Sequence, residues 1–332
     1  MYSLAPLHTF GLCSSTRRLL TIESINELQS LLDDYDPDTF YILGEGSNTV
    51  FLEDYAGTVI KPAFMGINLE HSATHYLLKV GASENWHQLV IWCMQNKIYG
   101  LENLALIPGT VGAAPIQNIG AYGLEIAEFI EHVYYYDLVD KAHNSLDLKA
   151  CEFAYRDSVF KNRLEGKAII TGVTFAIPKD WQAVLHYGDL KELLKPSAID
   201  IFNKVVNMRM DKLPDPSKIG NAGSFFKNPV INLNHYIKLQ QNWPCIPSYR
   251  VDTDKVKVPA AWLIEQLGFK GIKIGGIGCH PKQALVLTND GSGTGVELLE
   301  LARSIKDSVL NEFEIVLANE VRLVGKHGTI NL

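Results

Sequence analysis

The spacing of apolar side chains divides the first half of the chain into short strands and helices. Apolar positions three and four residues apart predict a helix over 22–34 and another over 85–96. Shorter apolar runs predict strands over 39–43, 58–61, 76–80, 129–138 and 168–176. This half therefore alternates β and α structure, and a segment dense in Gly, Ala and Pro at 107–123 interrupts the alternation.

The second half has a core of its own. Its elements are a connection between domains over 204–221, helices over 259–267 and 296–310, and strands over 284–288 and 315–324. In the last of these strands a period of two places Ala318, Glu320 and Arg322 on one face. A carboxylate is thus expected to project from a mostly apolar segment.

Composition sets the size and class of the protein. The chain has 332 residues, 47% of them hydrophobic and 20% charged, which indicates a globular protein of two domains with room for a small third one. A net charge of −7 argues against nucleic acid as a partner, because phosphate binding needs clustered Lys and Arg. No run approaches the ~20 apolar residues of a membrane helix, so we expect no insertion into a membrane.

Cysteines and histidines predict neither disulfides nor a metal site. His71 and His75 are four residues apart, but they flank a predicted strand and lack a companion carboxylate. Arg17 and Arg18 are not followed by the apolar region of an export signal, so the expected location is the cytoplasm. The cysteines are odd in number and widely spaced, and we expect them to be reduced and mostly buried: Cys13, Cys93, Cys151, Cys245 and Cys279.

Two glycine-containing segments suggest a nucleotide cofactor. Gly44–Asn48 directly follows a predicted strand, and its backbone N–H groups could cradle a diphosphate. The segment is no Rossmann fingerprint, because Thr49 replaces the third glycine and no helix follows. Small residues over 107–123 would let a ring system and phosphates lie on the backbone. An ordinary glycine turn and close packing between strands are the respective alternatives.

Two further segments carry polar chemistry. Ser224 lies among small residues in Gly220–Pro229, without a Gly-x-Ser-x-Gly elbow or a catalytic triad, so it would act as a proton carrier. A simple turn residue is the alternative. Arg156, within Tyr155–Lys161, suits a bound carboxylate or phosphate, and a surface ion pair with Asp157 is the alternative.

These motifs together resemble one family. The segments closely resemble, over nearly the whole chain, the UDP-N-acetylenolpyruvoylglucosamine reductase (UDP-N-acetylmuramate dehydrogenase) family: Gly44–Asn48, Ile107–Gly123, Tyr155–Lys161, Gly220–Pro229 and Asn319–Arg322. Tyr187-Gly188-Asp189 and an insertion around Tyr249 resemble its type I branch. The resemblance implies an α+β protein with an FAD-binding fold of the vanillyl-alcohol-oxidase (PCMH) type, built of two subdomains, and a C-terminal α+β substrate-binding domain. The implied limits are 1–64 completed by 320–332, then 65–213, and 214–319.

The resemblance also implies a reaction. A cytoplasmic, monomeric flavoenzyme would use NADPH to reduce UDP-N-acetylglucosamine enolpyruvate to UDP-N-acetylmuramate for peptidoglycan synthesis. Hydride from flavin N5 would add to the β-carbon and drive charge into the carboxyl group, which Arg156 and a protonated Glu320 would stabilise. Ser224 is implied as the proton donor to the α-carbon. Since 107–123 contains no histidine, we expect the FAD to be bound without a covalent tether.

Binding residues follow from the same resemblance, and no metal is among the implied groups. The implied flavin-binding residues are Gly44, Glu45, Gly46, Ser47, Asn48, Pro108, Gly109, Thr110, Gly112, Ala113, Gln117, Asn118, Gly120 and Ala121. The implied substrate-binding residues are Tyr122, Tyr187, Lys212, Asn228, Lys270 and Gln283. A core tyrosine or a solvated lysine is the alternative at the substrate positions.

Two other functions compete with this reading. One is a flavin oxidase on the same fold that passes electrons to oxygen, and peroxide formation would identify it. The other is a nucleotide-sugar sensor without turnover, which would be colourless yet bind UDP-sugar. The segments around Ser224 and Glu320 argue against the oxidase, and the presence of Arg156 beside them argues against the sensor.

Overall fold

Backbone contacts divide the molecule into two compact units. The structure is a computed structural model that describes residues 1–34 and 36–332, without the side chain of Asp38. Unit 1 comprises Met1–Arg17, Gly46–Ala56 and Lys212–Leu332, and unit 2 comprises Arg18–Glu45 and Gly57–Asp211. Strands β2 (Ser15–Ile22) and β5 (Tyr55–Pro62) begin in unit 1 and end in unit 2.

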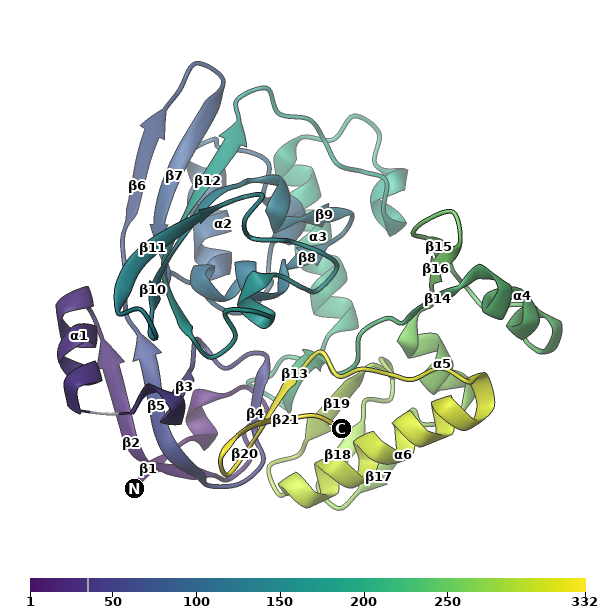
Figure 1. Ribbon diagram of the computed structural model, residues 1–332. Coiled ribbons are helices and arrows are strands. Elements are labelled where there is room, and N and C mark those ends of the chain that lie inside the picture. Colours follow the sequence, from purple (N-terminus) through teal and green to yellow (C-terminus); the bar gives the residue numbers. More distant parts are fainter. Residues whose placement is uncertain (35) are drawn as a thin grey trace. The chain divides into compact units, whose positions relative to one another are not determined.

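A five-stranded antiparallel sheet forms the centre of unit 2 (Figure 1). Its strands, in spatial order, are β11 (Ala142–Asp147), β10 (Ile130–Asp137), β12 (Ala168–Pro178), β7 (His75–Gly81) and β6 (Ile67–His71). Helix α2 (Trp86–Gln95) buries Trp86, Leu89 and Val90 in one core with Val133 and Phe175 of the sheet. Apolar residues that alternate along the strands thus supply this face of the sheet, and the strands predicted over 76–80, 129–138 and 168–176 are present as β7, β10 and β12.

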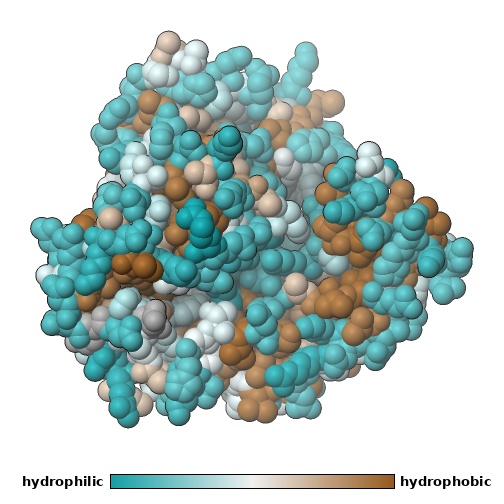
Figure 2. Space-filling view, in the orientation of Figure 1, coloured by the Kyte–Doolittle hydropathy of each residue, from teal (hydrophilic) through white to brown (hydrophobic). Residues whose placement is uncertain are grey.

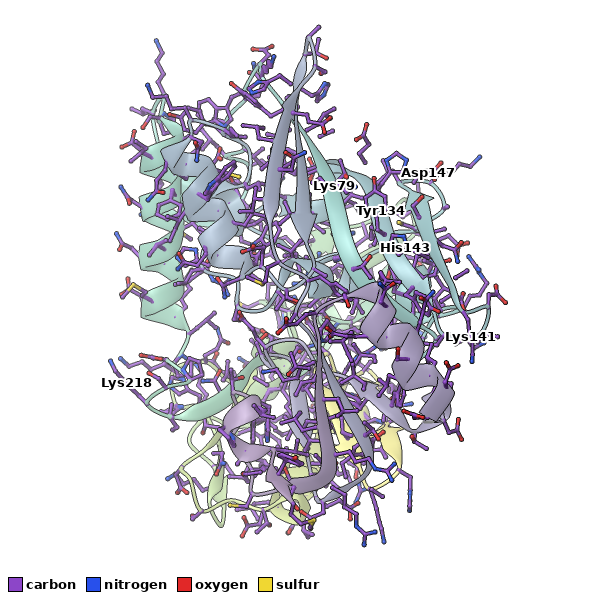
Figure 3. All side chains as sticks on the ribbon, turned by 90° about the vertical axis from the view of Figure 1, so that its left-hand side faces the viewer. Lys79, Tyr134, Lys141, His143, Asp147 and Lys218 are labelled. Atoms are coloured by element: carbon purple, nitrogen blue, oxygen red, sulfur yellow. The ribbon has the colours of Figure 1, made fainter. Side chains whose placement is uncertain are left out.

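The opposite face of this sheet is partly covered and partly polar. Helix α1 (Ile25–Asp34) packs Leu28 and Leu32 in a core with Tyr136, and β3 (Phe40–Ile42) pairs in parallel with β5 beside it. Lys79 and His143 lie on the uncovered part of this face (Figure 3). A groove of about 790 Å³ opens there, and its lining contains none of the predicted site residues.

The helix boundaries of unit 2 follow from capping. Asn85 accepts a hydrogen bond from the Gln88 N–H at 2.9 Å, which begins α2 one residue inside the predicted range. The predicted helix over 22–34 begins at Ile25. Two short strands, β8 (Gly120–Ala121) and β9 (Leu124–Glu125), pair within the loop region of this unit.

The prediction of a connection over 204–221 was wrong in its first half. Helix α3 (Ala198–Lys212) buries Ile201, Val205 and Met208, which are four and three residues apart. Pro214 and Pro216, which suggested a linker, follow only after the helix has ended. The connection itself is limited to residues 213–219.

Unit 1 is built of small sheets and three helices. Its sheets have the strand orders β13-β19-β18-β17, β14-β16-β15 and β21-β20-β4, and β1 (Tyr2–Ser3) pairs with the start of β2. The strands are β4 (Thr49–Phe51), β13 (Gly220–Ser224), β14 (Val230–Asn232), β15 (Tyr249–Arg250), β16 (Lys255–Lys257), β17 (Lys273–Ile274), β18 (Ile277–Cys279), β19 (Val286–Asn289), β20 (Arg322–Gly325) and β21 (Gly328–Ile330). The helices are α4 (Leu233–Asn242), α5 (Ala260–Gln266) and α6 (Gly295–Phe313).

Helix α6 supplies much of the core of unit 1. A capping box between Thr294 and Glu297 begins it, and Leu298, Leu301 and Ile305 are fully buried. The predicted helices over 259–267 and 296–310 are confirmed as α5 and α6. The predicted strand over 284–288 begins later, at Val286 in β19. Large apolar or aromatic side chains are exposed on and beside β14–β16 and α4: Val230, Ile237, Tyr249 and Val251. Figure 2 shows brown, hydrophobic surface among the polar residues at the right of the view.

Only the end of the predicted strand over 315–324 pairs with another strand in a sheet. Only Arg322–Gly325 lies in a strand, β20, which pairs in parallel with β4. The predicted alternation nevertheless holds, because Leu317 and Val321 are buried while Glu320 between them is partly exposed. Glu320 therefore lies on the predicted face, but at a bend just before β20 and not within a regular sheet.

Candidate functional site

The backbone of unit 1 brings the segments of Ser224 and Glu320 together. Directly after Ser224, the Phe225 carbonyl accepts a hydrogen bond from the Glu320 N–H at 2.8 Å. The Lys227 N–H donates to the Ala318 carbonyl at 2.9 Å in the same pairing. Two of the three predicted catalytic residues thus come from adjacent, paired segments of one unit.

Gly44–Asn48, the predicted diphosphate-binding segment, is called the phosphate loop below. Its last residue, Asn48, bonds to this pairing. Its side-chain amide donates to the Glu320 carbonyl at 3.2 Å, and its own carbonyl accepts from the Arg322 N–H at 2.9 Å. Gly46 has φ +69°, and a Cβ there would collide with the Leu7 carbonyl. Among the residues that the structure describes, the backbone N–H groups of Gly46 and Ser47 find no acceptor. Such adjacent N–H groups are suited to an anion.

In unit 2, Glu45 bonds to the second glycine-containing segment, 107–123. Its carboxylate accepts hydrogen bonds from the Asn85 amide at 2.6 Å and from the Gly109 N–H at 3.1 Å. A Cβ on Gly44 would lie 3.2 Å from the Thr110 hydroxyl, so a larger residue there would require the Thr110 side chain to shift. The predicted flavin loop residues 44, 45, 109 and 110 are therefore neighbours in one unit.

Close packing explains part of the 107–123 segment. A Cβ on Gly112 would come within 2.6 Å of Ala82, and the Gly112 N–H donates to the Ala82 carbonyl at 2.7 Å. Asn118 has φ +43°, and its amide donates to Glu125 at 2.7 Å and accepts from the Ala127 N–H at 3.1 Å. At Gly112 the small size is thus required by packing against the protein itself.

Arg156 is oriented by backbone groups. It has φ +54°, and its Nη2 donates to the Gly120 carbonyl at 3.0 Å. Lys161 donates to the Arg156 carbonyl at 3.1 Å. The Asp157 carboxylate caps its own turn by accepting from the Ser158 N–H at 3.0 Å and from the Asn162 amide at 3.1 Å. The guanidinium therefore lies beside the end of the predicted flavin segment.

Two predicted substrate tyrosines meet in unit 2, together with an arginine that sequence reasoning missed. The rings of Tyr122 and Tyr187 are 5.9 Å apart at an angle of 89°. Burial raises the pKa of the Tyr122 hydroxyl, which is hydrogen-bonded to Arg209, and the charge of Arg209 partly offsets that rise. Burial lowers the pKa of the Arg209 guanidinium. Arg209 lies on α3, which was read as a connection, so no helical face was available to reveal it.

Two adjacent buried polar residues, Glu102 and Asn103, were also missed, and they bond to the segments that contain Tyr122 and precede Tyr187. The Asn103 amide donates to the Tyr122 carbonyl at 3.0 Å and to the Val184 carbonyl at 2.9 Å. The Glu102 carboxylate accepts from Trp181 Nε1 at 2.5 Å, and burial raises the pKa of Glu102. Sequence alone does not distinguish a buried Glu-Asn pair from an exposed one, so no signal pointed to them.

The remaining predicted substrate residues belong to unit 1 and have structural partners. The Asn228 amide oxygen accepts from the Ala260 N–H at 2.9 Å, at the start of α5. Lys270 forms an ion pair with Glu265 at 2.5 Å, which matches the alternative of a surface lysine. Gln283 lies in the turn before β19, and Lys212 is the exposed last residue of α3.

The comparisons with known proteins identify the family. Residues 215–324 match the family model described as UDP-N-acetylenolpyruvoylglucosamine reductase, C-terminal domain, and residues 17–144 match that of an FAD binding domain. The reductase of that name from Pseudoalteromonas atlantica is 54% identical over 330 residues, 99% of this chain and 96% of the relative. The chain belongs to the UDP-N-acetylenolpyruvoylglucosamine reductase family. A second member, from Pseudoalteromonas translucida, is 47% identical over 100% of this chain and 98% of its own length.

Membership of this reductase family makes the chain an oxidoreductase with an FAD-binding domain. The crystal structure of the reductase from Thermus caldophilus has a TM-score of 0.68 and 23% identity over 97% of both chains, and it shows the same fold. The predicted α+β FAD-binding fold is therefore confirmed. The residues present fit FAD, because the N–H groups of Gly46 and Ser47 suit its diphosphate.

Other types of site can be judged for the described part of the chain. Over residues 1–34 and 36–332, no helix is both long and apolar enough to cross a membrane. The same residues contain no group of His, Cys, Asp and Glu side chains that could hold a metal ion. All five cysteines are free; Cys93, Cys151 and Cys279 are buried, as expected, while Cys13 and Cys245 are exposed.

Proposed function

We propose that this chain reduces UDP-N-acetylglucosamine enolpyruvate to UDP-N-acetylmuramate with NADPH as the electron source, a step of peptidoglycan precursor synthesis. The observation that carries the proposal is the pairing of the Ser224 and Glu320 segments in unit 1, with Asn48 of the phosphate loop bonded to the Glu320 carbonyl. A hydroxyl, a carboxyl group and an anion-binding loop are thereby held in one backbone network. The names of the close relatives, each a UDP-N-acetylenolpyruvoylglucosamine reductase, support this substrate and its reduction.

The chemistry divides between the cofactor and the chain. FAD, once reduced by NADPH, would supply a hydride to the β-carbon of the enolpyruvyl group. As that bond forms, negative charge moves into the substrate carboxylate, and the Glu320 carboxyl would stabilise it by donating a hydrogen bond. The Ser224 hydroxyl would then give its proton to the α-carbon, which completes the lactyl ether. Glu320 is fixed for this role by the bonds of its N–H and carbonyl to Phe225 and Asn48.

Arg156 would bind the substrate carboxylate. Its planar guanidinium matches two carboxylate oxygens, and the bond from Nη2 to the Gly120 carbonyl fixes its plane. Tyr122 and Tyr187 would hold the UDP-sugar, because an edge-to-face pair presents both a ring face and hydroxyl groups. Asn228, Gln283, Lys212 and Lys270 are the proposed contacts to uridine and phosphates from unit 1.

The remaining parts of the proposal concern organisation. We propose three domains, over 1–64 with 320–332, 65–213 and 214–319, with FAD bound without a covalent tether by the predicted residues of 44–48 and 108–121. The enzyme would act in the cytoplasm as a monomer of the type I branch. The absence of histidine from 107–123 supports the non-covalent cofactor.

An anaerobic titration tests the proposal. NADPH is expected to bleach the visible absorbance band of the oxidised flavin. UDP-N-acetylglucosamine enolpyruvate is then expected to restore that band. A band that bleaches and stays bleached would reject the substrate assignment. Peroxide formed in air in proportion to substrate would instead identify an oxidase.

A single substitution tests the proton donor. Ser224→Ala is expected to slow flavin reoxidation by the substrate about 10²–10³-fold, because one transition-state group is lost, and to leave reduction by NADPH unchanged. Ser217→Ala is the matched control, since Ser217 lies in the exposed connection and its hydroxyl donates to the Asp215 carboxylate at 2.8 Å. Equal loss in both half-reactions would contradict the role of Ser224.

A further inference from the structure

Strand β13 contains an extra residue just before Ser224. Asn221 pairs with Thr288 of β19, and Ser224 pairs with Val286, so three steps along β13 correspond to two along β19. Gly223 within this bulge has φ +70°. Side chains of a strand alternate between its faces, and one extra residue reverses the alternation beyond it. The bulge therefore determines on which face Ser224 lies.

The side chain of Asn221 holds this bulge closed. It is 5% exposed, and its Oδ1 accepts a hydrogen bond from the Gly223 N–H at 3.1 Å. Its Nδ2 donates to the Pro214 carbonyl at 3.1 Å and to the Ile219 carbonyl at 3.0 Å. Both donors and the acceptor of the amide are thus used, and they tie the bulge to the connection that precedes β13.

We propose that Asn221 is a positioning residue for proton delivery, which acts by keeping the bulge in β13 and hence the Ser224 hydroxyl on the reacting face. This inference rests on the proposed role of Ser224. Phe225 follows the bulge and Ser224 directly. Its N–H donates to the Leu285 carbonyl at 2.7 Å, and its carbonyl accepts from the Glu320 N–H, so the bulge sets the register of both bonds. A strand without the bulge would place Ser224 on the other face or lose one of these bonds.

Two substitutions open the bulge in different ways. Asn221→Ala removes the acceptor of the Gly223 N–H. Gly223→Ala keeps the amide but places a side chain at φ +70°, where no atom within 4 Å would meet its Cβ, so any effect comes from the backbone conformation. Each variant is expected to slow flavin reoxidation by the substrate about tenfold or more, with reduction by NADPH changed less than about twofold.

Amide hydrogen exchange gives a readout that does not depend on turnover. In the protein without added substrate, peptides that cover 221–226 are expected to exchange at least about tenfold faster in Asn221→Ala than in the wild type. Unchanged exchange in these peptides would overturn the proposal, because the bulge would then be held by other bonds.

A second buried asparagine of the same sheet is the control. Asn289 of β19 pairs opposite Gly220, is 3% exposed, and uses its amide to bond the Phe10 carbonyl and the N–H groups of Gly291 and Gly293. Asn289→Ala is expected to lower thermal stability as Asn221→Ala does, with both half-reactions changed equally. If Asn289→Ala slows reoxidation selectively, Asn221 has only a structural role and the proposal fails.

The double variant separates this inference from the proposed function. If Asn221 acts through Ser224, adding Asn221→Ala to Ser224→Ala gives less than about twofold further loss in reoxidation. A full additional loss would show that Asn221 acts on something else. If Ser224→Ala alone has no selective effect, the proposed role of Ser224 fails; if it has one and Asn221→Ala does not, only the positioning role fails.

Discussion

A buried histidine under the phosphate loop makes the stability of unit 1 depend on pH. His8 is 4% exposed, its Nε2 lies 3.4 Å from the Leu12 carbonyl, and its ring packs edge-on against Phe51. Burial lowers the pKa of His8 from 6.5 to about 4. The ring therefore stays neutral in the folded protein at pH 5, whereas the unfolded chain binds a proton there.

The sign and size of the effect follow from this difference. Because the unfolded state binds more protons between the two pKa values, the stability that His8 contributes is complete above about pH 6.5 and is lost as the pH falls toward 4. A pH of 5 lies about 1.5 units below the pKa of 6.5 that His8 has in the unfolded chain. At ~1.4 kcal/mol per unit, the free energy of unfolding falls by about 2 kcal/mol. For a protein of 332 residues that corresponds to a fall in Tm of about 3 °C.

Thermal melts of the wild type and His8→Gln, both saturated with FAD, measure this effect at pH 7.5 and pH 5. Glutamine cannot titrate and retains a donor for the Leu12 carbonyl, so the variant should lose about 3 °C less than the wild type between the two pH values. Other groups titrate equally in both proteins and cancel in the comparison. If the two proteins lose stability in parallel, the neutral buried state of His8 is refuted.

Three further outcomes are expected. Gly46→Ala should lower the affinity for FAD by about tenfold or more, because the added Cβ would collide with the Leu7 carbonyl and displace the loop backbone. Fluorescence titration measures this affinity. Asn103→Ala should raise KM for the UDP-sugar while flavin reduction by NADPH is unchanged in stopped flow, since both carbonyls that it holds belong to the segments of the tyrosine pair. In the native protein a thiol reagent should modify Cys13 and Cys245 rapidly and the three buried cysteines only after unfolding.

The sequence pattern predicted elements well where local chemistry decides them. Helix α2 was placed to within one residue because Asn85 supplies a cap and the apolar spacing is regular. Helix α3 was missed because the prolines after it dominated the reading of 204–221. The segment before β20 has the alternation of a strand but lacks neighbouring strands along most of its length, and periodicity alone cannot reveal a missing partner.

The candidate site residues were named from motifs more than from physical reasoning. Ser224 and Glu320 were named from their order in the chain, but their pairing through Phe225 is a long-range contact that spacing does not encode. Arg209 and Asn103 were missed because their roles depend on burial and on bonds to distant carbonyls. The bulge at Gly223 was equally invisible, since a glycine among small residues is compatible with any turn.

The parallel pairing of β4 with β20 also sets a limit on how the protein is made. Thr49 lies opposite Arg322, so the strand that follows the phosphate loop gains its partner only when nearly the whole chain has left the ribosome. Unit 2 ends at Asp211 and can fold first, whereas unit 1 must wait for its last segment. A truncated chain that lacks residues after 320 should therefore contain a folded five-stranded sheet yet bind FAD more weakly, because the strand that follows Gly46 and Ser47 would lack its partner.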